Sequence, residues 1–133
     1  MYRVAIITIS DKGAAGQRED LSGPAIQELA EQAGYAVTRT EMIPDEQARI
    51  SALLAEIADQ NQADLLLTTG GTGFAPRDVT PEATLAIAER AVPGIGEAMR
   101  TYSLTITPRA MLSRATAAIR KQTLIVNLPG SPK

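Results

Sequence analysis

The sequence of 133 residues contains no cysteine and no histidine. Without these residues the chain cannot form disulfides, hold an iron–sulfur cluster through thiolates, bind zinc through Cys and His ligands, or use a thiolate nucleophile or a His-dependent triad. Any chemistry must use carboxylates, hydroxyls, ammonium or guanidinium groups, backbone amides or a bound cofactor. At this length we expect one domain, residues 1–133, with its own hydrophobic core.

The chain also has no large surplus of positive or negative charge, few aromatic side chains and no long apolar runs. Thirteen basic and 15 acidic residues give a net charge of −2, and aromatic residues make up 3% of the chain, with no tryptophan. Both features argue against nucleic-acid binding. The longest apolar stretches, such as 4–7 and 65–67, are far shorter than the roughly 20 residues of a membrane span, and no secretory signal pattern is present. We therefore expect a cytoplasmic enzyme or binding domain.

Strand and helix patterns alternate along the chain without a linker. A continuous apolar run at residues 4–9, and the segment 64–68 with its three leucines, are typical of strands buried on both faces. Further strands are predicted at 35–43 and 123–128. Helices are predicted from about 22 to 33, from 44 to 58, from 80 onward, from 95 to 104 and from 110 to 118. Strands connected by helices form right-handed crossovers, so the pattern predicts a doubly wound α/β domain with a mostly parallel sheet.

In such sheets ligands bind beyond the carboxyl ends of the strands, and an unusual segment lies there. Residues 68–73, Thr-Thr-Gly-Gly-Thr-Gly, follow the strand at 64–68. Three glycines let the backbone turn tightly and bring N–H groups close to an anion, and the threonine hydroxyls add donors. A simple turn is the alternative, but the position after a buried strand favours anion binding. The spacing fits neither the Walker A nor the dinucleotide G-x-G-x-x-G motif.

Two carboxylates lie in neighbouring segments that also follow predicted strands. Asp78 belongs to the proline-flanked segment 75–81, and Asp45 to residues 43–46, Ile-Pro-Asp-Glu. Each could simply favour the positive end of the helix that it precedes. Beside a phosphate-binding loop, both become candidates for holding a divalent metal ion. The spacing alone does not establish that they converge.

Taken together, these segments resemble the molybdopterin-binding, MogA/MoaB-like family of molybdenum cofactor biosynthesis. The resemblance is carried by residues 67–73 and 76–84. It extends over almost the whole chain, through residues 4–11, 43–46, 112–114 and 127–133. The segment 77–81, the Met99-Arg100 pair and Ser103 look closer to the MogA type than to the MoaB type.

The resemblance implies a three-layer α/β fold, a molybdopterin-binding-like domain and molybdopterin adenylyltransferase activity. In this reaction AMP passes from ATP to the terminal phosphate of the substrate molybdopterin, and pyrophosphate leaves. The resemblance also implies Mg²⁺ with ATP, a homotrimer, and a molybdate-inserting enzyme as a candidate partner.

Family roles can be carried over residue by residue. Asp45 and Asp78 match the two catalytic aspartates and are the expected metal ligands. The residues that match the substrate-binding positions are Ser10, Asp11, Thr69, Gly70, Gly71, Thr72, Gly73, Asn127, Pro129, Gly130 and Ser131. Among them, the loop 69–73 is expected to hold the terminal phosphate of the pterin, and residues 127–131 to line the nucleotide side. Ser103 and Arg114 are further candidates for the site, but surface or helix-packing roles for them are equally consistent with the sequence.

Relatives continue beyond the segment 129–133 with a further helix, so we expect this chain to lack the family's C-terminal helix. Two other functions stay open on the sequence. One is a non-catalytic molybdopterin-binding carrier or scaffold subunit, and the other is a hydrolase of nucleotide-like compounds on the same fold. Incubation with ATP, Mg²⁺ and molybdopterin distinguishes the three.

Overall fold

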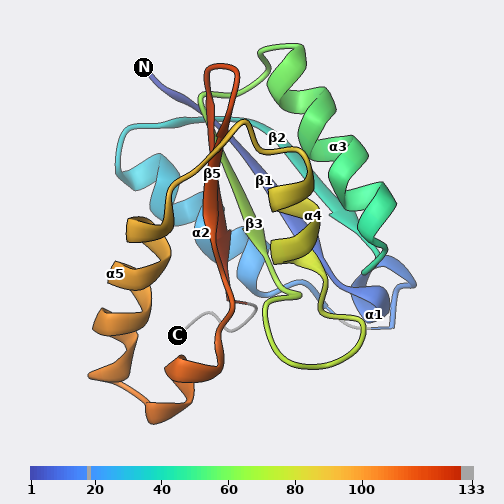
Figure 1. Ribbon diagram of the computed structural model, residues 1–133. Coiled ribbons are helices and arrows are strands. Elements are labelled where there is room, and N and C mark those ends of the chain that lie inside the picture. The colour runs from blue at the N-terminus through green and yellow to red at the C-terminus, as the bar shows by residue number, and fades with distance from the viewer. Residues whose placement is uncertain (18, 130–133) are drawn as a thin grey trace.

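A six-stranded sheet in the order β2-β1-β3-β6-β5-β4 organises the computed structural model, which describes residues 1–17 and 19–129 (Figure 1). The strands are β1 (Arg3–Ile9), β2 (Ala36–Ile43), β3 (Leu65–Thr69), β4 (Arg90–Ala91), β5 (Ala117–Arg120) and β6 (Thr123–Leu128). β1 pairs in parallel with β2 and β3, and β3 pairs in parallel with β6, whereas β5 is antiparallel to both β6 and β4. The predicted α/β class with a mostly parallel sheet is confirmed.

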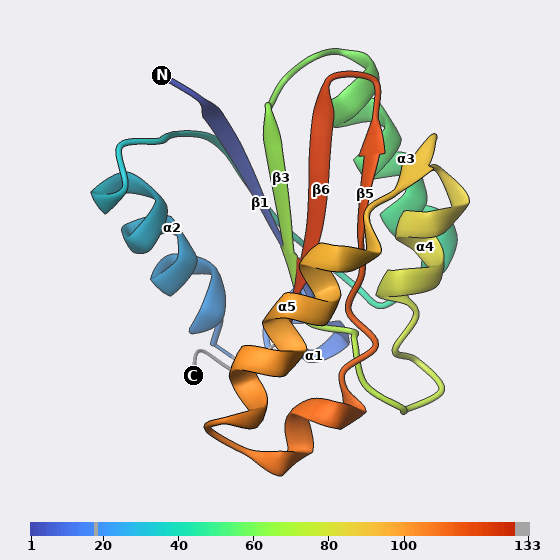
Figure 2. The same cartoon turned by 60° about the vertical axis from the view of Figure 1, so that its left-hand side comes forward.

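Helices cover both faces of the sheet and complete the three layers (Figures 1 and 2). Figure 2 shows α2 (Ser22–Gln32) and α5 (Pro93–Leu104) on one face, and α3 (Gln47–Asp59) and α4 (Thr80–Ala86) on the other. The short helix α1 (Asp11–Ala14) follows β1, and a 3₁₀ helix, η1 (Pro108–Leu112), follows α5. Across the described ranges, no helix combines the length and the apolar character needed to cross a membrane.

The hydrophobic core lies between the sheet and the helices α3 and α4. Ile50, Leu54 and Ile57 of α3 are fully buried and recur at the spacing of one helix face. They pack with Leu66 and Ile125 from the middle strands of the sheet. Burying a side chain of this size contributes roughly 1.5–3 kcal/mol, so this contact fixes α3 on the sheet. The strand ends that carry the polar loops are held by the same core.

The helix predicted at 110–118 is wrong. η1 ends at Leu112, and Ala117 and Ala118 instead enter β5, where both are fully buried. β5 forms a hairpin with β6 through a turn at Lys121, whose φ is +53°. Alanine favours a helix locally, but pairing with β6 and burial override that preference. The sequence pattern also missed the two-residue strand β4, whose residues are exposed and which pairs with β5 at the edge of the sheet.

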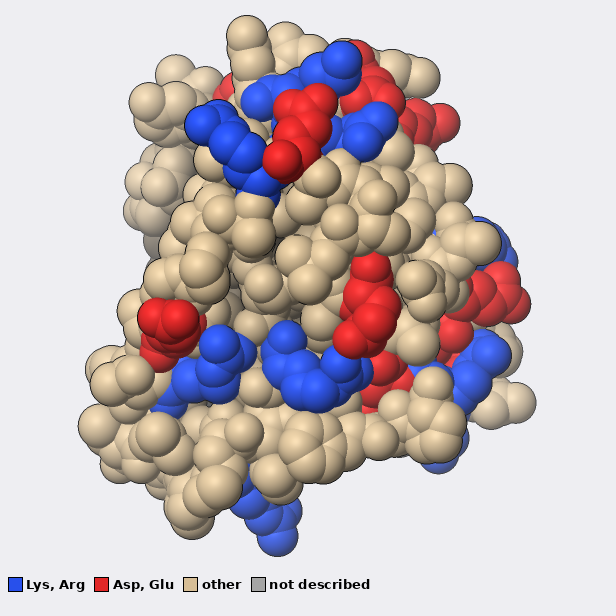
Figure 3. Space-filling view, in the orientation of Figure 1, with Lys and Arg blue, Asp and Glu red and all other residues tan. Residues whose placement is uncertain are grey.

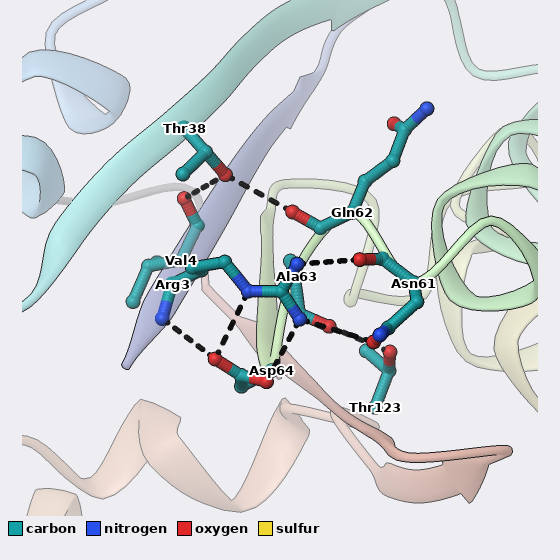
Figure 4. Close-up of polar contacts among 8 residues, drawn as sticks. All are labelled: Arg3, Val4, Thr38, Asn61, Gln62, Ala63, Asp64 and Thr123. Atoms are coloured by element: carbon teal, nitrogen blue, oxygen red, sulfur yellow. Dashed lines mark hydrogen bonds and ion pairs between the residues drawn. The ribbon is translucent and has the colours of Figure 1, made fainter. Parts of the chain in front are cut away.

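A polar network closes the amino-terminal edge of the sheet, opposite the glycine-rich loop (Figure 4). Asp64 Oδ2 accepts from the backbone N–H of Arg3 at 2.8 Å, and Asp64 Oδ1 accepts from Arg3 Nη2 at 3.0 Å. Arg3 Nη2 also donates to Asn61 Oδ1 at 3.0 Å, and Thr123 Oγ1 donates to the carbonyl oxygen of Ala63 at 2.8 Å. This edge of the sheet is therefore held together by contacts within the chain.

Candidate active site

The carboxyl ends of β1, β2 and β3 border a cleft of about 620 Å³, at the lower end of the sheet in Figure 1. Ligands of parallel α/β sheets bind at this edge. The cleft is lined by Thr8, Ile9, Ser10, Gly13, Glu19, Asp20, Leu21, Ser22, Met42, Asp45, Thr69, Gly70, Gly71, Thr72, Gly73 and Asp78. Four of these side chains are carboxylates, and none of these lining residues is Lys or Arg.

The glycine-rich loop after β3 makes a turn that only glycine accommodates. Gly70 and Gly71 have φ values of +99° and +71°. A Cβ on Gly70 would collide with the carbonyl oxygen of Ile9, and one on Gly71 would collide with Thr80 Oγ1. Thr80 Oγ1 also donates to the Gly70 carbonyl oxygen at 3.0 Å. The loop thus runs tightly between the end of β1 and the start of α4, with its backbone along the cleft.

Thr69 and Thr72 of this loop are buried, at 0% and 6% exposure, although both border the cleft. Thr69 Oγ1 donates to the carbonyl oxygen of Pro129 at 2.9 Å and lies 3.2 Å from Ser22 Oγ. The Thr69 hydroxyl therefore joins the end of β3 to the segment after β6. Gly130 and Ser131, which the sequence also placed at the site, lie outside the described residues.

Asn127 is fully buried beneath the loop and does not line the cleft. Asn127 Nδ2 donates to Thr68 Oγ1 and to Thr84 Oγ1, both at 3.0 Å, and Asn127 Oδ1 accepts from the backbone N–H of Thr116 at 3.2 Å. The predicted place of this side chain on the nucleotide side thus differs from the observed one. Its amide ties β3, α4 and β6 together behind the site.

Asp45 and Asp78 lie beside the same loop. A Cβ on Gly71 would lie 3.1 Å from Asp45 Oδ1, and a Cβ on Gly73 would lie 2.9 Å from Asp78 Oδ2. Asp78 Oδ2 also accepts from the backbone N–H of Ala75 at 3.0 Å. Burial raises the pKa of Asp45, and the nearby carboxylates of Asp11 and Asp78 raise it further. The structure therefore brings together the two aspartates and the glycine-rich loop, which the sequence could only place at neighbouring strand ends.

Asp11 is paired with Arg77 at the rim of the cleft. Arg77 Nε and Nη2 donate to the two carboxylate oxygens of Asp11 at 2.9 and 2.8 Å. Hydrogen bonds from Arg77, followed by one from the backbone of Asp45, lower the pKa of Asp11. On the sequence Arg77 could be read as a solvated surface charge, and the structure gives it a defined partner. Ser10 lines the cleft, and its Oγ accepts from the backbone N–H of Gly13 at 3.0 Å.

Three residues at or beside the site were missed or left undecided on the sequence. Asp20 lines the cleft and accepts from Thr8 Oγ1 and from the backbone N–H of Gly23, both at 2.9 Å. Its signal was an acidic residue just before a helix start, a common capping position. Glu19 also lines the cleft. Arg114 contacts the loop after β3, whereas Ser103, on α5, does not line the cleft.

On the face drawn in Figure 3, basic and acidic side chains lie next to one another without a broad patch of either sign. Ion pairs within the described part of the chain include those of Arg39 with Glu41 and Glu56 and of Arg120 with Asp59. In all, five arginines of the described residues form ion pairs with carboxylates of the chain: Arg3, Arg39, Arg77, Arg114 and Arg120.

The carboxylates of the cleft suit a magnesium ion that takes its remaining ligands from a bound molecule and water. Across residues 1–17 and 19–129, no group of three or more carboxylates is arranged to hold a metal ion by itself. Mg²⁺, however, is commonly held by one or two carboxylates together with substrate phosphates and water. Asp45, beside Gly71, and Asp78, beside Gly73, provide two carboxylates of this kind.

Comparison with known proteins identifies the family. Residues 5–133 match the family model described as a probable molybdopterin binding domain. The chain is 50% identical over 133 residues to a molybdopterin adenylyltransferase of Escherichia coli strain K12, covering 98% of this chain and 68% of the relative. It is 47% identical over 135 residues to one of Haemophilus influenzae, covering 100% of this chain and 68% of the relative. A solved structure of the molybdopterin biosynthesis enzyme MoaB from Thermus thermophilus is 51% identical, covers 99% of this chain and 83% of its own, and superimposes with a TM-score of 0.91. The chain belongs to this molybdopterin-binding family.

Proposed function

We propose that this chain is a molybdopterin adenylyltransferase of molybdenum cofactor biosynthesis, which transfers AMP from ATP to the terminal phosphate of molybdopterin and releases pyrophosphate. The observation that carries the proposal is the meeting of Asp45 and Asp78 at one glycine-rich loop, beyond the ends of parallel strands. Membership of the family supports it, because relatives about 50% identical over nearly the whole chain bear this name.

The loop 69–73 is proposed to bind the terminal phosphate of molybdopterin. Its positive φ values at Gly70 and Gly71, and its lack of side chains there, let a phosphate approach backbone N–H groups closely. A phosphate monoester is largely ionised near neutral pH. Its oxygen can therefore attack the α-phosphorus of ATP without a general base, which agrees with a chain that lacks histidine.

The reaction forms one P–O bond to the α-phosphorus and breaks the bond between that phosphorus and the oxygen of the leaving pyrophosphate. Holding the two anionic reactants in line is the main demand in such transfers. Among the described residues, those that line the cleft include four carboxylates and no Lys or Arg. Asp45 and Asp78 are proposed to hold Mg²⁺, which offsets the negative charge of the ATP phosphates when bound. The loop amides then orient the attacking phosphate.

The test is incubation of the chain with ATP, Mg²⁺ and molybdopterin, followed by analysis for adenylylated pterin and pyrophosphate. The expected result is equal amounts of the two products, formed only when both substrates are present. Pterin binding without turnover would instead identify a carrier and contradict the proposal. Cleavage of ATP without a pterin product would contradict it in favour of a hydrolase.

The proposal includes a requirement for magnesium, assembly as a homotrimer, a cytoplasmic location and transfer of the product to a molybdate-inserting enzyme. Chelation of divalent cations should stop turnover, and added Mg²⁺ should restore it. Light scattering coupled to gel filtration should give three times the mass of the chain. A monomer that retains full activity would remove the trimer from the proposal without affecting the reaction.

A further inference from the structure

Three strand ends are joined at the rim of the cleft by contacts that run from Arg77 through Asp11 to Asp45. Asp11 follows β1, Asp45 follows β2, and Arg77 lies in the loop after β3. The backbone N–H of Asp11 donates to Asp45 Oδ2 at 2.9 Å, and the backbone N–H of Asp45 donates to Asp11 Oδ1 at 2.9 Å. Arg77 adds the bidentate hydrogen bonds to the Asp11 carboxylate that are described above. Asp11 and Asp45 therefore restrain each other through reciprocal hydrogen bonds, and the Arg77 guanidinium restrains Asp11.

These contacts occupy both carboxylate oxygens of Asp11. Oδ1 accepts from the backbone N–H of Asp45 and from Arg77 Nη2, and Oδ2 accepts from Arg77 Nε. Asp11 does not line the cleft, whereas its neighbour Ser10 does. Its carboxylate thus points to donors of the chain itself, which does not suit the substrate-binding role that the resemblance implied.

The two carboxylate oxygens of Asp45 have different surroundings. Oδ2 accepts from the backbone N–H of Asp11, whereas Oδ1 lies beside Gly71, 3.1 Å from where a Cβ of that residue would stand. The reciprocal bonds restrain both the main chain and the side chain of Asp45. Its Oδ1 is consequently held at the glycine-rich loop, where the reacting phosphates are proposed to lie.

We propose that Asp11 and Arg77 form a positioning pair that fixes the Asp45 carboxylate for adenylyl transfer, and that neither residue binds substrate. The inference rests on the proposed function, because Asp45 is assigned its role there. Support shells of this kind orient functional carboxylates, and their loss commonly lowers activity by about 10- to 100-fold. Arginine suits the task because its planar fork bonds both oxygens of a carboxylate, which lysine cannot do.

The pair is exposed enough for its effect on the reaction to be separated from an effect on stability. The Arg77 and Asp11 side chains are 60% and 40% exposed. Ion pairs at such positions contribute little to the free energy of unfolding. Substitution of Arg77 should therefore leave the melting temperature close to that of the unmodified chain.

The experiment is a double-mutant cycle with Asp11→Ala, Arg77→Met and the double variant, together with Arg77→Lys. The control is Arg90→Met, which removes an exposed guanidinium from β4 at the far edge of the sheet. We expect each single change to lower kcat by about 10- to 100-fold with KM for ATP and pterin nearly unchanged. The double variant should be no slower than the slower single variant, because the two residues act through one contact. Arg77→Lys should recover part of kcat, and calorimetric affinity for molybdopterin should stay constant.

Several results would overturn the inference. A raised KM for either substrate with unchanged kcat would show direct substrate contacts, and multiplying effects in the double variant would show independent roles. Arg77→Met with unchanged kcat would remove Arg77 from the pair. The unmodified chain is assayed alongside, so that failure of the positioning pair can be distinguished from failure of the proposed function. If it forms no adenylylated pterin, the function itself is wrong.

Discussion

Arg114 Nε donates to the carbonyl oxygen of Gly73 at 2.7 Å, although 41 residues separate the two along the chain. The same guanidinium donates through Nη2 to the carbonyl oxygen of Asp78 and through Nη1 to Glu82 Oε2, both at 2.6 Å. The backbone N–H of Arg114 donates to the carbonyl oxygen of Thr72 at 2.8 Å. The segment before β5 therefore holds the glycine-rich loop and the loop that carries Asp78 in one arrangement.

Replacement of Arg114 by methionine should lower adenylyl transfer by about 10- to 100-fold, because the carbonyl oxygens of Gly73 and Asp78 lose their shared donor. Glu82→Gln is the matched control, because it weakens only the partly exposed ion pair and leaves both carbonyl contacts in place. Steady-state rates of product formation measure the difference. Equal losses in the two variants would mean that the ion pair, and not the loop contacts, matters.

Gly71→Ala should abolish or severely weaken pterin binding, since its Cβ would strain a backbone with φ of +71° and would meet Thr80 Oγ1 inside the site. Gly34→Ala separates strain from collision. Gly34 has φ of +91° but nothing within 4 Å of an added Cβ, and the left-handed conformation costs roughly 1–2 kcal/mol by itself. Calorimetric titration with molybdopterin should give normal affinity for Gly34→Ala. Normal affinity for Gly71→Ala would contradict the loop assignment.

Asp78→Asn should leave pterin binding largely intact and lower adenylyl transfer by about 100-fold or more, because charge stabilisation at the reacting phosphates is lost. Glu19→Gln makes the same change of charge in the same cleft at a residue that does not flank the glycine-rich loop. Binding and turnover are measured in parallel on both variants. A wild-type rate for Asp78→Asn would remove this residue from the metal site.

The unfolding free energy should fall in acid partly through Asp64. Hydrogen bonds from the side chain and backbone of Arg3 lower the pKa of Asp64 in the folded chain. Such a group stabilises the fold above its unfolded pKa of about 3.9, and this contribution is lost as the pH falls through the lower folded value. Urea unfolding of Asp64→Asn between pH 6 and pH 3 should show a smaller dependence on pH than the unmodified chain. An unchanged dependence would mean that the network in Figure 4 does not act on this carboxylate.

Local sequence patterns predicted the parts of the fold that depend on local chemistry. The strand predicted at 4–9 has a continuous apolar run, the strand predicted at 64–68 has three consecutive leucines, and α3 has apolar residues at helical spacing. The helix predicted at 110–118 was wrong because the local helix preference of its alanines is overridden by tertiary contacts. Ala117 and Ala118 lie in a strand only because β6 and the core surround them.

At the site, residue types with a strong backbone requirement were predictable, and long-range contacts were not. Gly70 and Gly71 could be assigned to a tight loop because few other residues adopt their φ values. The positions of Asp20 and Arg114, and the interior place of Asn127, depend on partners between 11 and 59 residues away. No local pattern records such partners.

By itself the sequence determined the α/β class, the glycine-rich loop, the resemblance to a molybdopterin-binding family and the exclusion of Cys and His chemistry. Each of these follows from composition, from periodicity or from a motif that is continuous in the chain. Only the tertiary structure decided that Asp45 and Asp78 both lie beside the glycine-rich loop, that Asp11 pairs with Arg77, and that Asn127 is buried. These contacts form where the ends of parallel strands lie next to one another. The packing of the hydrophobic core determines which strand ends are adjacent.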